Sequence, residues 1–263
     1  MKIATWNVNS IKVRLERVIQ FLQREDPDFL CLQELKCVEE KFPYEALASV
    51  GYQCAVFGQK TYNGVAILSK QKPGRILKGL DHADLDKEAR VLSADFGSFR
   101  LICIYVPNGQ EVGSEKYLYK LSWMKALEKY LAQSLKAFPQ QVLCGDFNIA
   151  QSDLDIYDPE PWREGILFSE KEKIALKKVL DLGFVDLYRS LHATQPGFTW
   201  WDYRNFSFQK NHGLRIDLVL GTPPIRNTLE EVYVDKLERK GIQPSDHAPV
   251  IAVFKKELLT HLN

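Results

Sequence analysis

The sequence predicts a single α+β domain. The chain has 263 residues, 45% of them hydrophobic, which is enough to bury one sizeable core. Short apolar runs typical of buried strands alternate with amphipathic segments of helical period. No Ser/Gly linker, low-complexity tract or internal repeat divides the chain, so we expect one domain at residues 1–255 and a short tail at 256–263.

The composition limits the possible function classes. The formal net charge is +1, from 35 basic and 34 acidic residues. A protein that binds nucleic acid by charge alone is usually far more basic, so any phosphate-binding surface must be a local patch. The five Cys are odd in number and lack zinc-type spacing, which predicts reduced thiols. We expect a cytoplasmic protein, because the N-terminus has no leader pattern and no apolar run approaches the roughly 20 residues that cross a bilayer.

The N-terminal part is predicted to form a strand, a helix and a second strand. The first strand, at 2–9, ends in Asn7 and Asn9, which lie two apart and therefore share a face. Ser10 is predicted to cap the helix, whose apolar positions recur with helical period. The second strand stays apolar until it reaches Glu34. The polar ends of both strands are therefore expected to face one rim.

The middle of the chain is predicted to contain most of the remaining strands. A short helix is expected at 43–48, and a long amphipathic helix, with Leu118 on its apolar side, at 114–137. Further strands are expected at 52–57, 64–69, 76–80, 91–96 and 100–106. The last of these again ends in polar groups, Tyr105 and Asn108.

A buried strand at 142–146 ends in Asp146-Phe147-Asn148. Alternate side chains of an extended segment share a face, so Asp146 and Asn148 should project together. A carboxylate and an amide at the end of an apolar strand need partners when they are desolvated. A simple turn would explain an isolated Asp-x-Asn pair equally well, so the pair gains weight only from the rest of the chain.

The C-terminal part continues with a long irregular segment at 152–167, a length that is often functional inside a compact domain. A helix is expected at 170–182. A strand at 213–220 carries Asp217 inside it, and a final strand at 245–254 begins with Asp246-His247.

Polar side chains thus follow several strands in the same manner. Each alone has an ordinary explanation, as a turn former or a structural His. Polar groups placed after several strands at one edge of a sheet build one crevice, as in open α/β sheets. The candidate residues are Asn7, Asn9, Glu34, Tyr105, Asn108, Asp146, Asn148, Asp217, Asp246 and His247.

These groups suit a hard divalent cation and a phosphate ester. Glu34 offers a carboxylate, and the amides and Asp246 offer further oxygens. The absence of a Cys/His cluster argues against structural zinc, whereas few protein oxygens with room for water and phosphate suit Mg²⁺. Asp217 could orient the His247 imidazole, and Asp146 could hold or deprotonate a water. The remaining amides and the Tyr105 phenol could donate hydrogen bonds to the reacting phosphate.

The sequence blocks around these residues resemble the exonuclease III family of abasic-site endonucleases. They occur in family order and cover nearly the whole chain. The resemblance implies the four-layer α/β/β/α sandwich of the DNase I-like fold, with two mixed β-sheets face to face and helices outside. The blocks are Trp6–Asn9, Leu32–Lys36, Tyr62–Ala66, Tyr105–Gly109, Gly145–Asn148, Gly213–Asp217 and Ser245–Pro249.

The resemblance also implies residue roles. It places the metal, Mg²⁺ with Mn²⁺ expected to substitute, among Asn7, Asn9, Glu34, Asp146, Asn148, Asp246 and His247. It makes the catalytic set Tyr105, Asn108, Asp146, Asn148, Asp217 and His247. Basic and aromatic residues on or near the strand-end loops are candidates for phosphate contacts, although a single Lys is more often simply solvated at the surface. They are Lys36, Tyr62, Arg204 and Arg215, with Lys116, Lys120 and Lys210. The resemblance further implies an apolar pocket for an extruded abasic sugar at Leu167, Trp201 and Leu214, with Trp200 expected to be core.

The implied activity is that of a DNA repair nuclease, combining 3′-to-5′ exodeoxyribonuclease, 3′-phosphatase or phosphodiesterase, and abasic-site endonuclease. The expected substrate is double-stranded DNA with abasic sites or with blocked or recessed 3′ ends, and a nucleoid-associated monomer is expected. Ile166 and Leu167 are bulky where the family's loop usually carries small residues, so preference could shift toward 3′-end processing. Two alternatives keep the fold: a phosphoesterase of small phosphorylated substrates, or a non-catalytic nucleic-acid-binding regulator.

Overall fold

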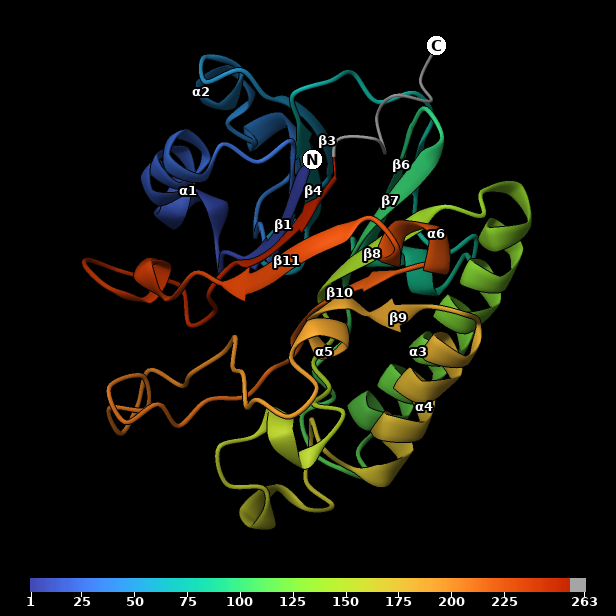
Figure 1. Cartoon of the computed structure of the whole chain (residues 1–263), viewed down its shortest axis with the longest axis vertical. Helices are drawn as coiled ribbons and strands as arrows, with labels where there is room; N and C mark the ends of the chain where they lie inside the picture. Colours follow the sequence, from blue (N-terminus) through green and yellow to red (C-terminus); the bar gives the residue numbers. More distant parts are fainter. Residues whose placement is uncertain (256–263) are drawn as a thin grey trace.

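Two six-stranded sheets lie face to face at the centre of the computed structural model, which describes residues 1–255 (Figure 1). The first sheet has the order β11 (Leu229–Val234), β12 (Val250–Phe254), β1 (Lys2–Asn7), β2 (Phe29–Gln33), β4 (Val65–Ser69) and β3 (Gln53–Phe57). The second has the order β5 (Ile76–Lys78), β6 (Val91–Phe96), β7 (Phe99–Tyr105), β8 (Gln141–Asp146), β10 (Asp217–Gly221) and β9 (Val185–Asp186). Both sheets are mixed, because β1 pairs with β2 and β7 pairs with β8 in parallel.

Helices cover the outer face of each sheet (Figure 1). α1 (Ile11–Glu25) and α2 (Tyr44–Ala48) lie against the first sheet, and α3 (Glu115–Ala137) and α4 (Glu170–Asp181) lie against the second. Two short helices, α5 (Leu187–Leu191) and α6 (Pro223–Arg226), contact β10. Short 3-10 turns lie at Glu39–Lys41, Leu85–Lys87, Asp153–Asp155, Glu160–Trp162 and Lys236–Arg239. The predicted four-layer α/β/β/α sandwich is confirmed.

The core has three layers because the strands are buried on both faces. In β8, Val142 and Cys144 point into the space between the sheets, whereas Leu143 points toward α3 and α4. In β1, Ile3 faces the other sheet and Ala4 faces α1. Side chains alternate across a strand, so a strand covered on both sides reads as a continuous apolar run, as the sequence does here.

The strand register brings the polar strand ends to one edge. β1 and β2 are parallel, so Asn7 at the end of β1 lies beside Gln33, immediately before Glu34. In the second sheet, Asp146 pairs with Tyr105 of β7 on one side and with Asp217 of β10 on the other. The same edge of the sandwich therefore receives side chains from both sheets and from both ends of the chain.

Several predicted elements differ in detail. The strands predicted from 213 and 245 begin only at Asp217 and Val250, and the residues before them form loops. Ser10 stands at the N-cap position of α1 with a φ of 92°. Its side chain makes no capping hydrogen bond, so the predicted side-chain cap is wrong. Leu118 of α3 is 58% exposed, and Trp123 is buried instead.

Two further expectations concern the chain as a whole. The five Cys are free thiols, as predicted. No helix in the described part of the chain is both long and apolar enough to span a membrane. The predicted tail at 256–263 lies outside the described residues.

Candidate active site

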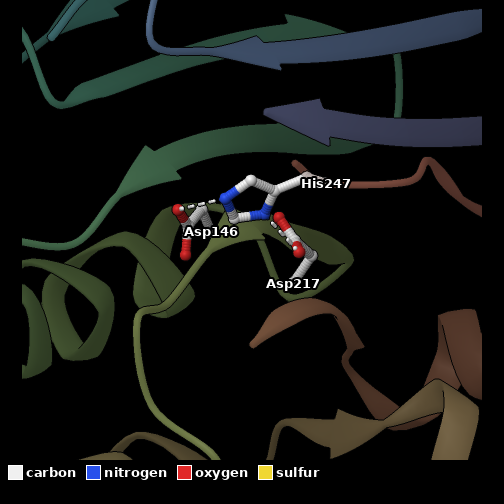
Figure 2. Close-up of side chains that lie close together, drawn as sticks. All are labelled: Asp146, Asp217 and His247. Carbon is white, nitrogen blue, oxygen red and sulfur yellow. Dashed lines mark hydrogen bonds and ion pairs between the residues drawn. The ribbon is translucent and has the colours of Figure 1, made fainter. Parts of the chain in front are cut away.

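Asp146, Asp217 and His247 meet at the edge between the two sheets (Figure 2). The imidazole lies between the two carboxylates: its Nδ1 is 2.8 Å from Asp217 Oδ2, and its Nε2 is 3.8 Å from Asp146 Oδ2. All three residues are at least nine-tenths buried. Two carboxylates so close together and away from water need a positive charge nearby.

The imidazole supplies that charge. Burial alone would lower the pKa of His247, but the carboxylates of Asp217 and Asp146 raise it to about 10. His247 is therefore an imidazolium at neutral pH. The ligand atoms of the three residues all lie within 4.8 Å of one another, close enough to hold a metal ion, and with the imidazole protonated the group is a carboxylate–imidazolium–carboxylate cluster.

Asp146 is poised between its protonated and ionised forms. Burial raises its pKa to about 7, and the Asp217 carboxylate adds to the rise, while His247 and hydrogen bonds from Asn7 and Asn148 oppose it. Gly145, the residue before it, has a φ of 148°, and a Cβ there would lie 1.9 Å from a carbonyl oxygen of β7. Only glycine lets β8 approach β7 closely enough to place Asp146 at this edge.

Glu34 is the centre of a second cluster, joined to the first by Asn7. The Asn7 amide donates to Glu34 Oε1 and to Asp146 Oδ2, both at 2.9 Å. The Tyr105 hydroxyl donates to the same Glu34 oxygen at 2.9 Å. Burial alone would raise the pKa of Glu34, but the hydrogen bond from Asn7 and the ammonium of Lys36 have the larger combined effect. The net pKa is below the usual value, so the carboxylate stays ionised. Burial and the nearby carboxylates raise the pKa of Tyr105, which therefore remains a neutral donor.

Oxygen atoms near Glu34 already hold one positive charge. The Lys36 ammonium lies 2.9 Å from Glu34 Oε2 and 2.6 Å from Asn9 Oδ1. Asn9 in turn donates to Asp246 Oδ1 at 2.9 Å. A position where a carboxylate and an amide oxygen hold an ammonium also fits a hard divalent cation, which prefers oxygen ligands. Asn7 differs from the prediction, because it presents its NH₂ group, not its carbonyl oxygen, to Glu34.

The two predicted amides complete the crevice. Asn148, in a left-handed conformation with φ 48°, donates from its backbone N–H to Asp146 Oδ1 at 2.9 Å and from its side chain to Val106 O at 3.0 Å. Asn108 is exposed, and its amide lies 3.3 Å from Asn148 Oδ1. All ten strand-end residues singled out in the sequence thus converge on one connected network.

Two predicted phosphate contacts are wrong. Arg215 is 1% exposed, and its guanidinium is 2.6 Å from Asp155 and 2.8 Å from Asp186. Lys120 is 0% exposed and pairs with Glu172. Both cations are paired with carboxylates inside the protein. The other predicted contacts are accessible: Lys36 is half-buried beside the site, and Tyr62, Lys116, Arg204 and Lys210 are exposed.

The two tryptophans have the opposite exposure from the one predicted for the pocket. Trp201 is fully buried and packs edge-on against Phe208. Trp200, expected to be core, is only partly buried, and its indole N–H donates to Asp246 Oδ2 at 3.0 Å. Trp200 packs against a buried cluster that includes Leu167 and Leu214. The apolar wall at the site is therefore made by Trp200, and the two leucines lie beneath it.

Two contributors were missed in the sequence. The hydroxyl of Thr199 accepts the backbone N–H groups of Ile216 and Asp217, both at 3.1 Å, and so fixes the start of β10. Arg90 stacks on Tyr105, with its guanidinium carbon 4.9 Å from the ring centre. Neither stands at the polar end of an apolar run, so the pattern that found the other residues gave no indication of them.

The chain belongs to the endonuclease/exonuclease/phosphatase family, whose model matches residues 4–247. Within it, the chain is similar to the exodeoxyribonuclease III of Haemophilus influenzae, with 33% identity over 97% of this chain and 100% of that protein. The family resemblance predicted from the sequence blocks is thereby confirmed.

Two solved structures share the fold closely. One is the 3′ phosphatase NExo from Neisseria bound to a product DNA hairpin, with a TM-score of 0.95 and 44% identity over 97% of this chain and 99% of that one. The other is an AP endonuclease from Archaeoglobus fulgidus, with a TM-score of 0.93 and 39% identity over 97% and 99% of the respective chains.

The protonation of His247 can be measured directly. We expect NMR titration of its ring protons to give a midpoint near 10, because two buried carboxylates stabilise the charged form. Asp217→Asn removes one of them and should lower the midpoint by at least about one pH unit. Asp84→Asn, at an exposed carboxylate, is the control and should leave it unchanged. A midpoint below 7 in the parent protein would contradict the charge assignment.

Proposed function

We propose that this chain is a metal-dependent DNA repair nuclease of the exonuclease III type, which hydrolyses phosphoesters of double-stranded DNA with an attacking water. Its substrates are abasic sites and blocked or recessed 3′ ends. The observation that carries the proposal is the convergence of Glu34, Asp146, Asp217 and His247 in one network of hydrogen bonds and ion pairs. The similarity to an exodeoxyribonuclease III, a 3′ phosphatase and an AP endonuclease supports the same reaction class.

Mg²⁺ is the proposed metal, with Mn²⁺ able to substitute. Glu34 and Asn9 would hold it where Lys36 now bridges their oxygens, with Asp246 beside them. A divalent ion bound there supplies positive charge to the phosphate oxygens. The set contains oxygen donors only, which favours Mg²⁺ over zinc.

Asp146 is the proposed acceptor of the water's proton. Its pKa of about 7 lets it be ionised in slightly alkaline solution while remaining basic enough to attract a proton. Asn7 and the backbone N–H of Asn148 hold its two oxygens in place. A water bound to this carboxylate would be oriented toward a phosphate in the crevice.

The donors around Asp146 are proposed to bind the phosphate. The His247 imidazolium offers a charged donor, and the amides of Asn108 and Asn148 offer neutral ones. The single proton of the Tyr105 phenol is donated to Glu34, so it would turn from that carboxylate to the phosphate when DNA binds. Donors fixed before the reaction stabilise the charge that develops on phosphate oxygens in the transition state. Asp217 acts through His247 by keeping it protonated and oriented.

DNA would contact the exposed side chains that surround the site. A cavity of about 840 Å³ opens beside Tyr105 and Asn108, and Tyr62 and Lys116 line it. On the other side, the segment at 203–212 extends away from the sheets and exposes Arg204 (Figure 1). Basic and aromatic groups on both sides suit an extended polyanion better than a small phosphate ester, which disfavours the small-substrate alternative. We further propose a cytoplasmic, nucleoid-associated monomer.

The test is a gel assay on duplexes that carry an abasic analogue, a recessed 3′ end or a 3′-phosphate. EDTA should abolish cleavage and Mg²⁺ should restore it. Glu34→Gln should lower kcat at least about 100-fold, because it removes the anionic metal ligand, whereas the exposed Glu231→Gln control should match the parent. Retained activity in Glu34→Gln would refute the metal assignment. DNA binding without cleavage by the parent chain would favour the non-catalytic regulator.

Leu167 tests the proposed bias toward 3′ ends. Its side chain is 5% exposed and supports the cluster beneath Trp200, and its φ of 72° suits glycine. Leu167→Gly should therefore open space for an extruded sugar without straining the loop. We expect the ratio of internal abasic incision to 3′-phosphate removal to rise by at least about tenfold. The exposed Leu191→Gly is the matched control, and an unchanged ratio in Leu167→Gly would discard the bias.

A further inference from the structure

Lys120 is a fully buried cation whose three donors are all engaged. It lies on α3, and its ammonium donates to Asn108 O at 3.1 Å, to Asn148 O at 2.6 Å and to the carboxylate of Glu172. A lysine ammonium has three hydrogens, so these bonds use every one of them. One buried ammonium therefore connects the backbone carbonyls of Asn108 and Asn148, two residues of the site that lie 40 positions apart in the sequence.

Glu172, the partner of Lys120, accepts hydrogen bonds from the loop below Trp200 and so connects Lys120 to that loop. It is also 0% exposed. Its Oε1 accepts the backbone N–H of Leu167 at 3.2 Å, and its Oε2 accepts the N–H and the hydroxyl of Ser169 at 3.0 and 2.6 Å. The Lys120–Glu172 pair thus connects α3, α4 and three loops of the site.

The loops that this pair holds adopt conformations that need outside support. Asn148 has a φ of 48° and Leu167 a φ of 72°, both in the left-handed region. That region is uncommon for residues other than glycine, and for Leu it is strained. Bonds from a rigid, buried ion pair can hold such a backbone in one geometry.

Stability alone does not account for an ion pair at this place. Taking two charges out of water costs so much that apolar side chains of similar volume are often as stabilising or more so. Lys120 stands on the buried stripe of α3, where Met124, Leu127 and Leu131 follow it at helical spacing. An apolar residue would continue that stripe, but it would leave the carbonyls of Asn108 and Asn148 without their donor.

We propose that Lys120 is a positioning residue: its ammonium fixes the backbones of Asn108 and Asn148 so that their amides meet the reacting phosphate. Through Glu172 it ties this geometry to the loop at Leu167. Lys120 is fully buried and cannot contact DNA itself. The inference rests on the proposed nuclease function and adds a residue that acts through the amides.

The test is Lys120→Met, which keeps the length of the side chain and removes its donors. We expect kcat to fall about 10- to 100-fold, because a small misplacement of transition-state donors is costly, while KM stays within about twofold of the parent. DNA affinity in EDTA should be unchanged, because no DNA-contacting group is altered. Rates are compared at a temperature where both proteins are fully folded.

Arg100→Met is the matched control. Arg100 is also buried, and it pairs with Asp95 at 2.6 and 3.0 Å in the β6–β7 hairpin, away from the crevice. We expect it to lower the melting temperature but to leave the kcat of the folded protein unchanged. A comparable loss of kcat in both variants would mean that any broken buried pair harms the enzyme, and it would overturn the inference.

Two further variants guard against misfolding. Lys120→Met with Glu172→Gln removes the uncompensated buried charge and should recover stability but not kcat. In a background of Asn108→Ala and Asn148→Ala, adding Lys120→Met should lower kcat by less than about threefold, because residues that act through each other are non-additive. An undiminished loss in that background, or a folded Lys120→Met with parental kcat, would overturn the inference. An inactive parent chain would instead refute the proposed function.

Discussion

The structure depends on a buried imidazolium held between two carboxylates. Asp146 and Asp217 lie on neighbouring strands, β8 and β10, directly opposite one another in register. Two negative charges so close in the interior would repel each other and force one to take up a proton. His247 removes this conflict by carrying the positive charge itself, so Asp146 can ionise near neutral pH. The chemistry proposed for this crevice follows from that balance of charges.

A second layer of buried charge holds the loops that present the site. Lys120 pairs with Glu172 behind the two amides, and Arg215 pairs with Asp155 behind β10. Arg215 immediately precedes Ile216 and Asp217, so its ion pairs fix the segment that leads into the carboxylate. Both cations were expected to bind phosphate. They contact no solvent, and their role in the structure is to connect irregular segments to the helices and sheets.

Much of the crevice could be predicted because its residues obey one simple rule. Each stands beside an apolar run. Glu34 follows β2 and Asp146 ends β8, whereas His247 precedes β12, which is antiparallel to β1 and therefore starts at the same edge. The three residues could therefore be grouped from the sequence alone. The two tryptophans could not be assigned, because residues 199–204 do not form a regular strand and alternation does not apply there. Lys120 could have been recognised as buried, since it occupies the apolar stripe of α3, but a charged residue is rarely expected inside a core.

The position of the metal tests the charge balance most directly. Anomalous diffraction from a crystal soaked in Mn²⁺ should give its strongest peak between Glu34 and Asn9, with the Lys36 ammonium displaced, because the Glu34 carboxylate stays ionised and these oxygens already hold a cation. A protonated His247 cannot bind a metal ion. A strongest peak within bonding distance of His247 Nε2 would show that the imidazole is neutral, and it would contradict the account.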